Sequence, residues 1–173
     1  MSKPIDIFAL TLISGDMYQK ILVPFDGSKS SVSALRHANE LAELEGDRAE
    51  ITLLYVIENI MLPPMTHSNV RSRTTGEVID REGILKEIYY SEKKTGKEML
   101  ENAAKSAHVT HKIKTELSYG SPPEKIVEFA KKHKIDLIVV GNVGLSGFSK
   151  LRALGSVSRC ISECSPCPVL IVH

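Results

Sequence analysis

The sequence is poor in the residues that build disulfide-rich and membrane-spanning proteins. It has no tryptophan, aromatic residues make up 5% of it, and its three cysteines all lie between positions 160 and 167. Three clustered cysteines do not make a disulfide framework. No apolar run approaches the roughly 20 residues of a membrane helix, and the apolar segment 5–13 is too short to span a bilayer. That segment also lacks a basic lead-in beyond Lys3 and the small-residue cleavage site of a signal peptide, so we expect a soluble, cytoplasmic protein with no membrane partner.

An excess of charge of one sign is missing as well. The 22 basic and 21 acidic side chains nearly cancel, which leaves no global basic field for binding nucleic acid. Hydrophobic residues make up 42% of the 173 positions, enough for one domain to bury a core without disulfides or metals. We therefore expect one main domain that does not bind nucleic acid.

Five short segments have the composition of β-strands. Four are continuously apolar, as in strands buried on both faces, and one alternates between apolar and polar residues. The predicted strands are 21–25, 49–57, 111–119, 135–140 and 168–173. Helical periodicity fills the four intervals between them. This alternation predicts an α/β fold with an open, doubly wound, five-stranded parallel sheet and helices on both faces, as in Rossmann-like proteins.

The first predicted helix follows strand 21–25. Ser28 or Ser30 can cap its N-terminus. Its apolar stripe is expected to consist of Val32, Leu35, Ala38, Leu41, Ala42 and Leu44.

Two segments stand outside this alternation. Residues 1–16 precede Met17, a natural start because the first strand follows at once, so they are either a mis-annotated upstream extension or a poorly ordered arm. The main domain is then 17–173. Within it, residues 58–82 contain Pro-Pro and no periodicity, which predicts a long variable loop of the kind that is usually functional or disordered.

A cluster of glycines follows the fourth predicted strand. Ligands of doubly wound sheets bind beyond the carboxyl ends of the strands, which makes this segment a candidate site. Gly141 and Gly144 allow positive φ and bring backbone N–H groups within reach of a ligand. In a sheet of order 3-2-1-4-5, this segment and the turn at Asp26 would be neighbours.

The same segment ends at a predicted helix start, Gly155-Ser156. Unpaired amides and the helix dipole favour an anion there, and Ser156 and Ser158 add hydroxyl donors. The segment is neither a Walker A loop nor a dinucleotide fingerprint. From the residues alone, two interpretations stay open: a phosphate cradle and a set of plain turn glycines.

Four segments carry a resemblance to a known family: "KILVPFDGSKSSVSALRHANELA", "ITLLYVIE", "GSPPEKIVEFAKKHKIDLIVVGNVGLSG" and "LGSVSRCISECSPCPVLIVH". From about Met17 to His173 they resemble the universal stress protein family, interrupted by the loop and the second predicted helix. The resemblance implies the sheet order 3-2-1-4-5 of an adenine nucleotide alpha hydrolase-like fold. It also implies dimers and, in one branch, ATP binding.

The ATP-binding branch has two glycines separated by two residues and, after a spacer, a third glycine followed by Ser or Thr. Gly141, Gly144 and Gly155-Ser156 match that pattern, but the spacer 145–154 is one residue longer than in the family. The resemblance implies that the nucleotide is bound by Pro24, Phe25, Asp26, Val56, Val140, Gly141, Asn142, Gly144, Gly155, Ser156, Val157 and Ser158. It further implies that Mg²⁺ accompanies the nucleotide, and that Val56 meets the adenine through its backbone.

The role of Asp26 stays open at this point. A carboxylate beside a triphosphate is repelled unless a cation lies between them. Asp26 is therefore expected to bond the base or sugar, to act through Mg²⁺, or only to order its turn.

The C-terminal segment raises two further questions. Cys160, Cys164 and Cys167 have a spacing used for iron–sulfur clusters, but their place on a terminal helix favours buried small hydrophobic side chains and no metal site. The strand 168–172 would be an apolar edge, which predicts a homodimer formed across it.

The leading functional hypothesis is an ATP-binding universal stress protein that acts as a nucleotide-responsive regulator. No nucleophile or general base is placed beside the glycines, although positioning and a metal ion alone can assist slow ATP hydrolysis. The first rival is a non-nucleotide-binding member that acts as a protein-interaction module. The second rival is an adenylating enzyme. Such enzymes use a Ser-Gly-Gly pyrophosphate loop after the first strand, and the segment "PFDGSKSS" of this sequence does not contain one.

Overall fold

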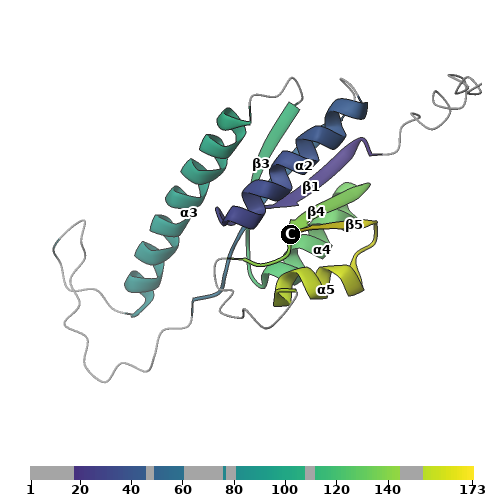
Figure 1. Ribbon diagram of the computed structural model, residues 1–173. Helices are drawn as coiled ribbons and strands as arrows, with labels where there is room; N and C mark the ends of the chain where they lie inside the picture. The colour runs from purple at the N-terminus through teal and green to yellow at the C-terminus, as the bar shows by residue number, and fades with distance from the viewer. Residues whose placement is uncertain (1–17, 46–48, 61–75, 77–80, 108–111, 145–153) are drawn as a thin grey trace, which may run out of the picture.

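The computed structural model describes residues 18–45, 49–60, 76, 81–107, 112–144 and 154–173. Within these ranges, strands and helices alternate along the chain (Figure 1). In order they are β1 (Lys20–Pro24), α2 (Lys29–Glu45), β2 (Glu50–Ile57), α3 (Arg81–Ser106), β3 (Lys112–Tyr119), α4 (Pro122–His133), β4 (Leu137–Gly141), α5 (Ser156–Cys164) and β5 (Val169–Val172). The predicted extension 1–16 and most of the predicted loop 58–82 lie outside the described residues. None of the described helices is both long and apolar enough to cross a bilayer.

The strands form one parallel sheet in the order β3-β2-β1-β4-β5, which confirms the predicted fold class. Ile21 of β1 pairs with Ile51 of β2 on one side and with Leu137 of β4 on the other. The strand order reverses between β1 and β4, so the turns that follow these two strands meet at the carboxyl edge of the sheet.

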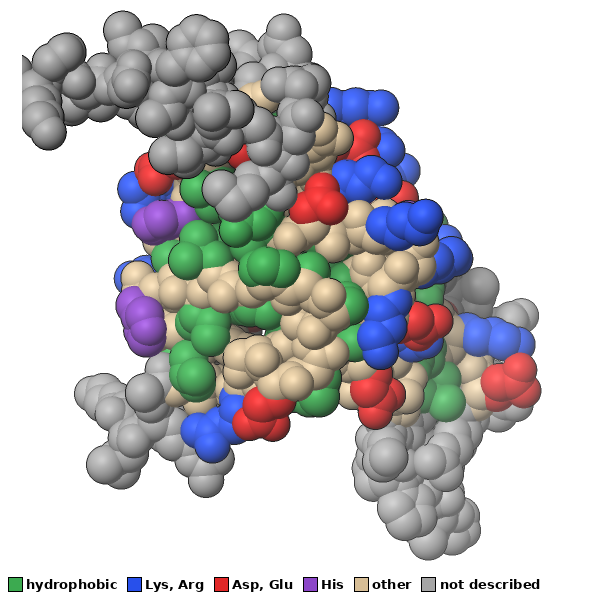
Figure 2. Space-filling view, turned by 90° about the vertical axis from the view of Figure 1, so that its right-hand side faces the viewer, with side chains coloured by type: hydrophobic (Ala, Val, Ile, Leu, Met, Phe, Trp, Pro, Cys, Tyr) green, Lys and Arg blue, Asp and Glu red, His purple; other side chains and the backbone are tan. Residues whose placement is uncertain are grey.

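The two edges of the sheet differ in chemistry. On β3, Lys114 and Lys112 lie 2.7 and 3.7 Å from carboxylate oxygens of Glu50 on β2. The other edge strand, β5, is short, apolar and only partly covered, with Leu170 36% exposed. The prediction that β5 is buried on both faces is therefore wrong. Figure 2 views the side of the molecule that includes β5 and shows hydrophobic side chains gathered there, with charged side chains toward the margins.

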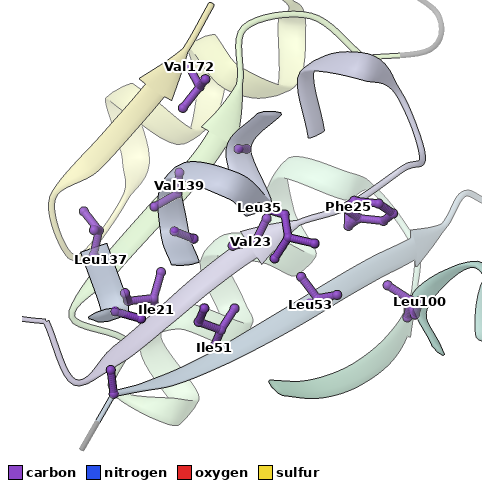
Figure 3. Packing of buried hydrophobic residues seen from close by; sticks show 14 residues of the cluster. Ile21, Val23, Phe25, Leu35, Ile51, Leu53, Leu100, Leu137, Val139 and Val172 are labelled. Carbon is purple, nitrogen blue, oxygen red and sulfur yellow. The ribbon is translucent and has the colours of Figure 1, made fainter. Parts of the chain in front are cut away.

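The core has two layers, one on each face of the sheet. On one face, Ile21, Val23 and Leu53 pack beneath Leu35 of α2, with Leu100 of α3 in the same cluster (Figure 3). On the other face, a second cluster of strand residues packs against α4 and α5. Burial of the apolar side chains in these two clusters is the main stabilising contribution, because each buried side chain gains about 1.5–3 kcal/mol.

Helix α2 packs with part of the predicted stripe, since Leu35, Ala38 and Ala42 are buried as predicted. Its buried residues are Ser31, Ala34, Leu35, Ala38, Asn39 and Ala42. Val32 is 53% exposed and Leu44 is 78% exposed, so the predicted stripe is wrong at both positions. Small side chains face the sheet instead because the helix lies close to it. The N-terminal cap is Ser28, whose Oγ accepts a hydrogen bond from the amide of Ser31 (3.1 Å).

The cysteines are less buried than predicted. Cys164 is exposed, while Cys160 and Cys167 are partly buried. Helix α5 is amphipathic and buries Ile161 against the sheet, which leaves Cys164 on its outer side. The prediction of three buried cysteines is therefore wrong, most clearly at Cys164.

Candidate functional site

A cleft of about 540 Å³ opens at the carboxyl edge of the sheet, where β1, β2 and β4 end. Its size is within the range of small-molecule sites. The predicted site residues, apart from Asn142, line it: Pro24, Phe25, Asp26, Val56, Val140, Gly141, Gly144, Gly155, Ser156, Val157 and Ser158. These residues come from three strand ends and from the N-terminus of α5, so the fold gathers segments that are far apart in the sequence.

Asn142 lies in the same turn but does not line the cleft. Its Nδ2 lies 3.1 Å from Nδ1 of His173, beyond the end of β5. Its backbone amide donates to the carbonyl of Val172 (2.8 Å), and its carbonyl accepts from the amide of Gly155 (2.7 Å). Asn142 therefore joins the turn after β4 to both β5 and α5.

Gly141 is required by the close approach of α2. A Cβ at this position would lie 2.6 Å from Cβ of Ser30 and 2.7 and 2.8 Å from its carbonyl carbon and oxygen. Neither Gly141 nor Gly144 uses the positive φ that glycine allows, since neither is among the described glycines with positive φ. Absence of a side chain, rather than left-handed backbone, is what the turn needs from Gly141.

Gly144 and Gly155 line the cleft with bare backbone. A Cβ on Gly144 would lie 2.8 Å from Oδ2 of Asp26, and one on Gly155 would lie 3.2 Å from the carbonyl oxygen of Asn142. The obstacle at Gly144 is the end of a side chain, whereas the obstacle at Gly155 is backbone. Both positions leave room beside the start of α5.

Serine hydroxyls tie the two turns together. The Ser30 hydroxyl, in the first turn of α2, donates to the carbonyl of Val143. The amide of Ser28 donates to Oδ1 of Asp26 (3.0 Å), which orders the turn after β1. The expectation that the two turns are neighbours is confirmed. One of the roles left open for Asp26, ordering its own turn, is present in the structure.

The N-terminus of α5 faces the cleft. Gly155 is the N-cap and provides no side-chain cap, and the first amides of a helix have no intrahelical acceptor. These amides belong to Ser156, Val157 and Ser158. The Ser158 hydroxyl, predicted as a ligand donor, is buried and donates to the carbonyl of Gly141 (2.7 Å). Ser156, by contrast, is exposed, so its hydroxyl is the one accessible from the cleft.

Sequence reasoning missed the wall opposite α5. Tyr55 of β2 and Glu92 of α3 line the cleft there, and the Tyr55 hydroxyl donates to Oε2 of Glu92 (3.3 Å). Burial, followed by the carboxylates of Glu92, Asp26 and Glu58, raises the pKa of the Tyr55 hydroxyl. No motif marks Glu92, because it reaches the cleft only through the packing of α3 on the sheet.

The described lining is therefore asymmetric. It contains three carboxylates, those of Asp26, Glu58 and Glu92, and among these described residues no lysine, arginine or histidine. Helix amides and small residues form one end. Asp26 lies beside Gly144 at that end, whereas apolar side chains, Tyr55 and Glu92 form the other.

Comparison with known proteins agrees with this architecture. The sequence model of the universal stress protein family matches residues 17–173. Universal stress protein YxiE of Bacillus subtilis is 38% identical over 91% of this chain and 100% of its own length. The solved structure of MJ0577, a universal stress protein of Methanocaldococcus jannaschii, is 30% identical with a TM-score of 0.72, covering 91% of this chain and 96% of that one.

A universal stress protein solved in complex with cAMP is also similar. It is 30% identical with a TM-score of 0.59, and the match covers 91% of this chain and 99% of that one. The match of the family model and the identity to relatives both extend over nine-tenths of the chain. The chain therefore belongs to the universal stress protein family.

Proposed function

We propose that this protein binds ATP, or another adenine nucleotide, in the cleft at the carboxyl edge of the sheet. The observation that carries the proposal is the pairing of two unlike surfaces in one cleft. The N-terminus of α5 offers amides to an anion, and the ends of β1, β2 and β4 offer apolar surface to a base.

The adenosine is assigned to the apolar end. Pro24 ends β1 and Phe25 follows it, and the buried Val56 and Val140 are the residues before the last of β2 and β4. These side chains form a wall against which a flat aromatic base can be desolvated, while the backbone of Val56 is available for hydrogen bonding to it. A relative that is 30% identical was solved in complex with cAMP, which supports an adenine nucleotide here.

The phosphates are assigned to the α5 end. Backbone amides of Ser156, Val157 and Ser158, with the Ser156 hydroxyl, would hold them, and Gly144 and Gly155 keep side chains out of their path. Mg²⁺ would come with the nucleotide and neutralise phosphate charge, since this ion is usually held by phosphates and one or two carboxylates. Asp26, beside Gly144, is the carboxylate placed to contact it directly or through water.

The role that follows is a nucleotide-responsive stress regulator that works as a homodimer. Strand β5 supports the dimer, because it is an apolar, partly uncovered edge, whereas β3 at the other edge carries lysines of the kind that discourage pairing. We expect Leu170→Lys to convert a dimer to a monomer in light scattering coupled to size exclusion. Thr115→Lys, on the exposed part of β3, is the matched control and should leave the mass unchanged. A wild-type protein that is monomeric at high concentration would contradict this part.

Calorimetric titration of the full chain with ATP and Mg²⁺ tests nucleotide binding. Wild type should bind saturably below millimolar concentration, whereas Gly144→Val and Gly155→Val should lose binding because their side chains fill the cleft floor. Circular dichroism checks that the variants are folded. Absence of binding by wild type would favour the rival function, a protein-interaction module without nucleotide. ATP turnover measured on the same samples decides whether slow hydrolysis accompanies binding.

A further inference from the structure

Helix α4 contributes side chains to the cleft, although the glycine pattern does not involve this helix. Pro122, its first residue, and Ile126, about one turn later, both line the cleft. Ile126 is 2% exposed and belongs to the same core cluster as Val56 and Val140. The two α4 residues therefore extend the apolar wall to which the adenosine is assigned.

Backbone contacts fix the start of α4 beside the end of β2. Tyr119, the last residue of β3, pairs with Ile57, the last residue of β2. The amide of Gly120 then donates to the carbonyl of Ile57 (3.0 Å), and the chain turns at Gly120, whose φ is +132°. Pro122 follows two residues later. Helix α4 therefore begins beside the end of the strand that carries Val56.

Pro122 presents apolar surface and no hydrogen-bond donor. Proline has no backbone N–H, and Pro123 occupies the next position, so the first two residues of α4 have no amide to donate to a ligand. Glu124 adds a carboxylate to the same first turn, whereas the first turn of α5 has neither a proline nor an acidic residue. The start of α4 is therefore suited to an uncharged, flat group and not to phosphate.

We propose that Pro122 is a binding residue for the nucleobase, with its ring packed against the face of the adenine. The inference rests on the proposed function. A proline ring contacts a flat base through apolar atoms and does not compete for its hydrogen-bonding edge, which is left to the backbone of Val56. Pro122 then contributes to the affinity for every ligand that carries the base, phosphorylated or not, and contributes nothing to phosphate binding.

The test is an NMR titration of the full chain with two probes, AMP and adenosine. Pro122→Ala should weaken the binding of both probes by the same factor, about three- to tenfold, because one or two methylene groups lose their contact with the base. Pro123→Ala is the matched control. Pro123 is also a partly buried proline in the first turn of α4, but it is not among the described residues that line the cleft, so both affinities should stay unchanged.

A second measurement observes the contact directly, since nuclear Overhauser effects should join the ring protons of Pro122 to those of the adenine in the AMP complex. An AMP affinity unchanged in Pro122→Ala, or lowered equally in Pro123→Ala, overturns this inference, while AMP binding by wild type leaves the proposed function standing. Loss of AMP affinity with adenosine affinity unchanged would place the phosphate at α4 and also overturns it. Failure of wild type to bind either probe overturns both proposals. Thermal melts of each variant exclude misfolding as the cause of a lost affinity.

Discussion

The two ends of the cleft differ in what lines them: backbone at one end and side chains at the other. The α5 end is made of backbone, with glycines at 141, 144 and 155 and a helix N-terminus whose amides face inward. The α3 end is made of side chains, with the Tyr55 hydroxyl donating to Glu92 beside Glu58. One end attracts an anion and the other repels it.

This difference shows how a cleft whose described lining has carboxylates and no basic side chain can still offer an anion one favourable end. A symmetric, basic cleft would hold a nucleotide in either direction. Here the helix dipole favours phosphate at α5, and the carboxylates disfavour it at α3. Under the proposed function, these opposed fields orient the nucleotide, although the described lining residues include no lysine or arginine.

The largest expected effect is a difference in stability between substitutions of two glycines at the α5 end. Gly141→Ala should destabilise the fold by about 1–3 kcal/mol, because its Cβ meets the backbone of Ser30, which cannot rotate away. Gly144→Ala should cost less than about 1 kcal/mol, since it meets only the movable carboxylate of Asp26. Urea denaturation of both variants measures the difference. Equal losses of unfolding free energy would mean that the close backbone contact at Gly141 matters no more than the side-chain contact at Gly144.

A charge at the helix start should move stability and binding in opposite directions. Ser156→Asp places a carboxylate in the first turn of α5, where the dipole stabilises it by about 0.3–1 kcal/mol. ATP affinity should nevertheless fall at least about tenfold, because the carboxylate repels the phosphates. Ser156→Asn is the matched neutral control. If Ser156→Asp and Ser156→Asn bind ATP equally in calorimetry, the phosphates are not at this end.

The smallest expected effect is a pH dependence at the α3 end. The folded protein raises the Tyr55 pKa above its ordinary value of 10.0, so folding favours the neutral phenol. The resulting stabilisation is complete below about pH 10 and is lost as the pH rises through the folded-state pKa. Urea denaturation at pH 8 and pH 11 should show a larger loss for wild type than for Tyr55→Phe. Identical losses in the two proteins would show that neither burial nor the carboxylates raise the pKa of this hydroxyl.

The sequence alone was sufficient for the fold because its signals are local. Four continuous apolar runs and one alternating run define the strands, and the helices between them force a parallel sheet. The departures have tertiary causes. β5 is half exposed because it ends the sheet, and Val32 faces solvent because α2 packs through small residues.

The cleft lining was predictable on the α5 side and not on the α3 side. Glycines and serines after a strand indicate a binding site lined by backbone amides. Tyr55 and Glu92, by contrast, are separated by 37 positions and meet only when α3 packs on the sheet. The outward direction of Asn142 likewise depends on His173 at the far end of the chain. The sequence also does not show why position 141 is glycine. The reason is that the backbone of α2 lies within contact distance of it in the folded protein.

A crystal structure of the full chain with ATP and Mg²⁺ tests the central claim most directly. The account predicts adenine beside Val56 and phosphates on the amides of Ser156 to Ser158. A nucleotide bound in the reverse direction, with phosphates toward Tyr55 and Glu92, or one bound outside the cleft, would contradict it.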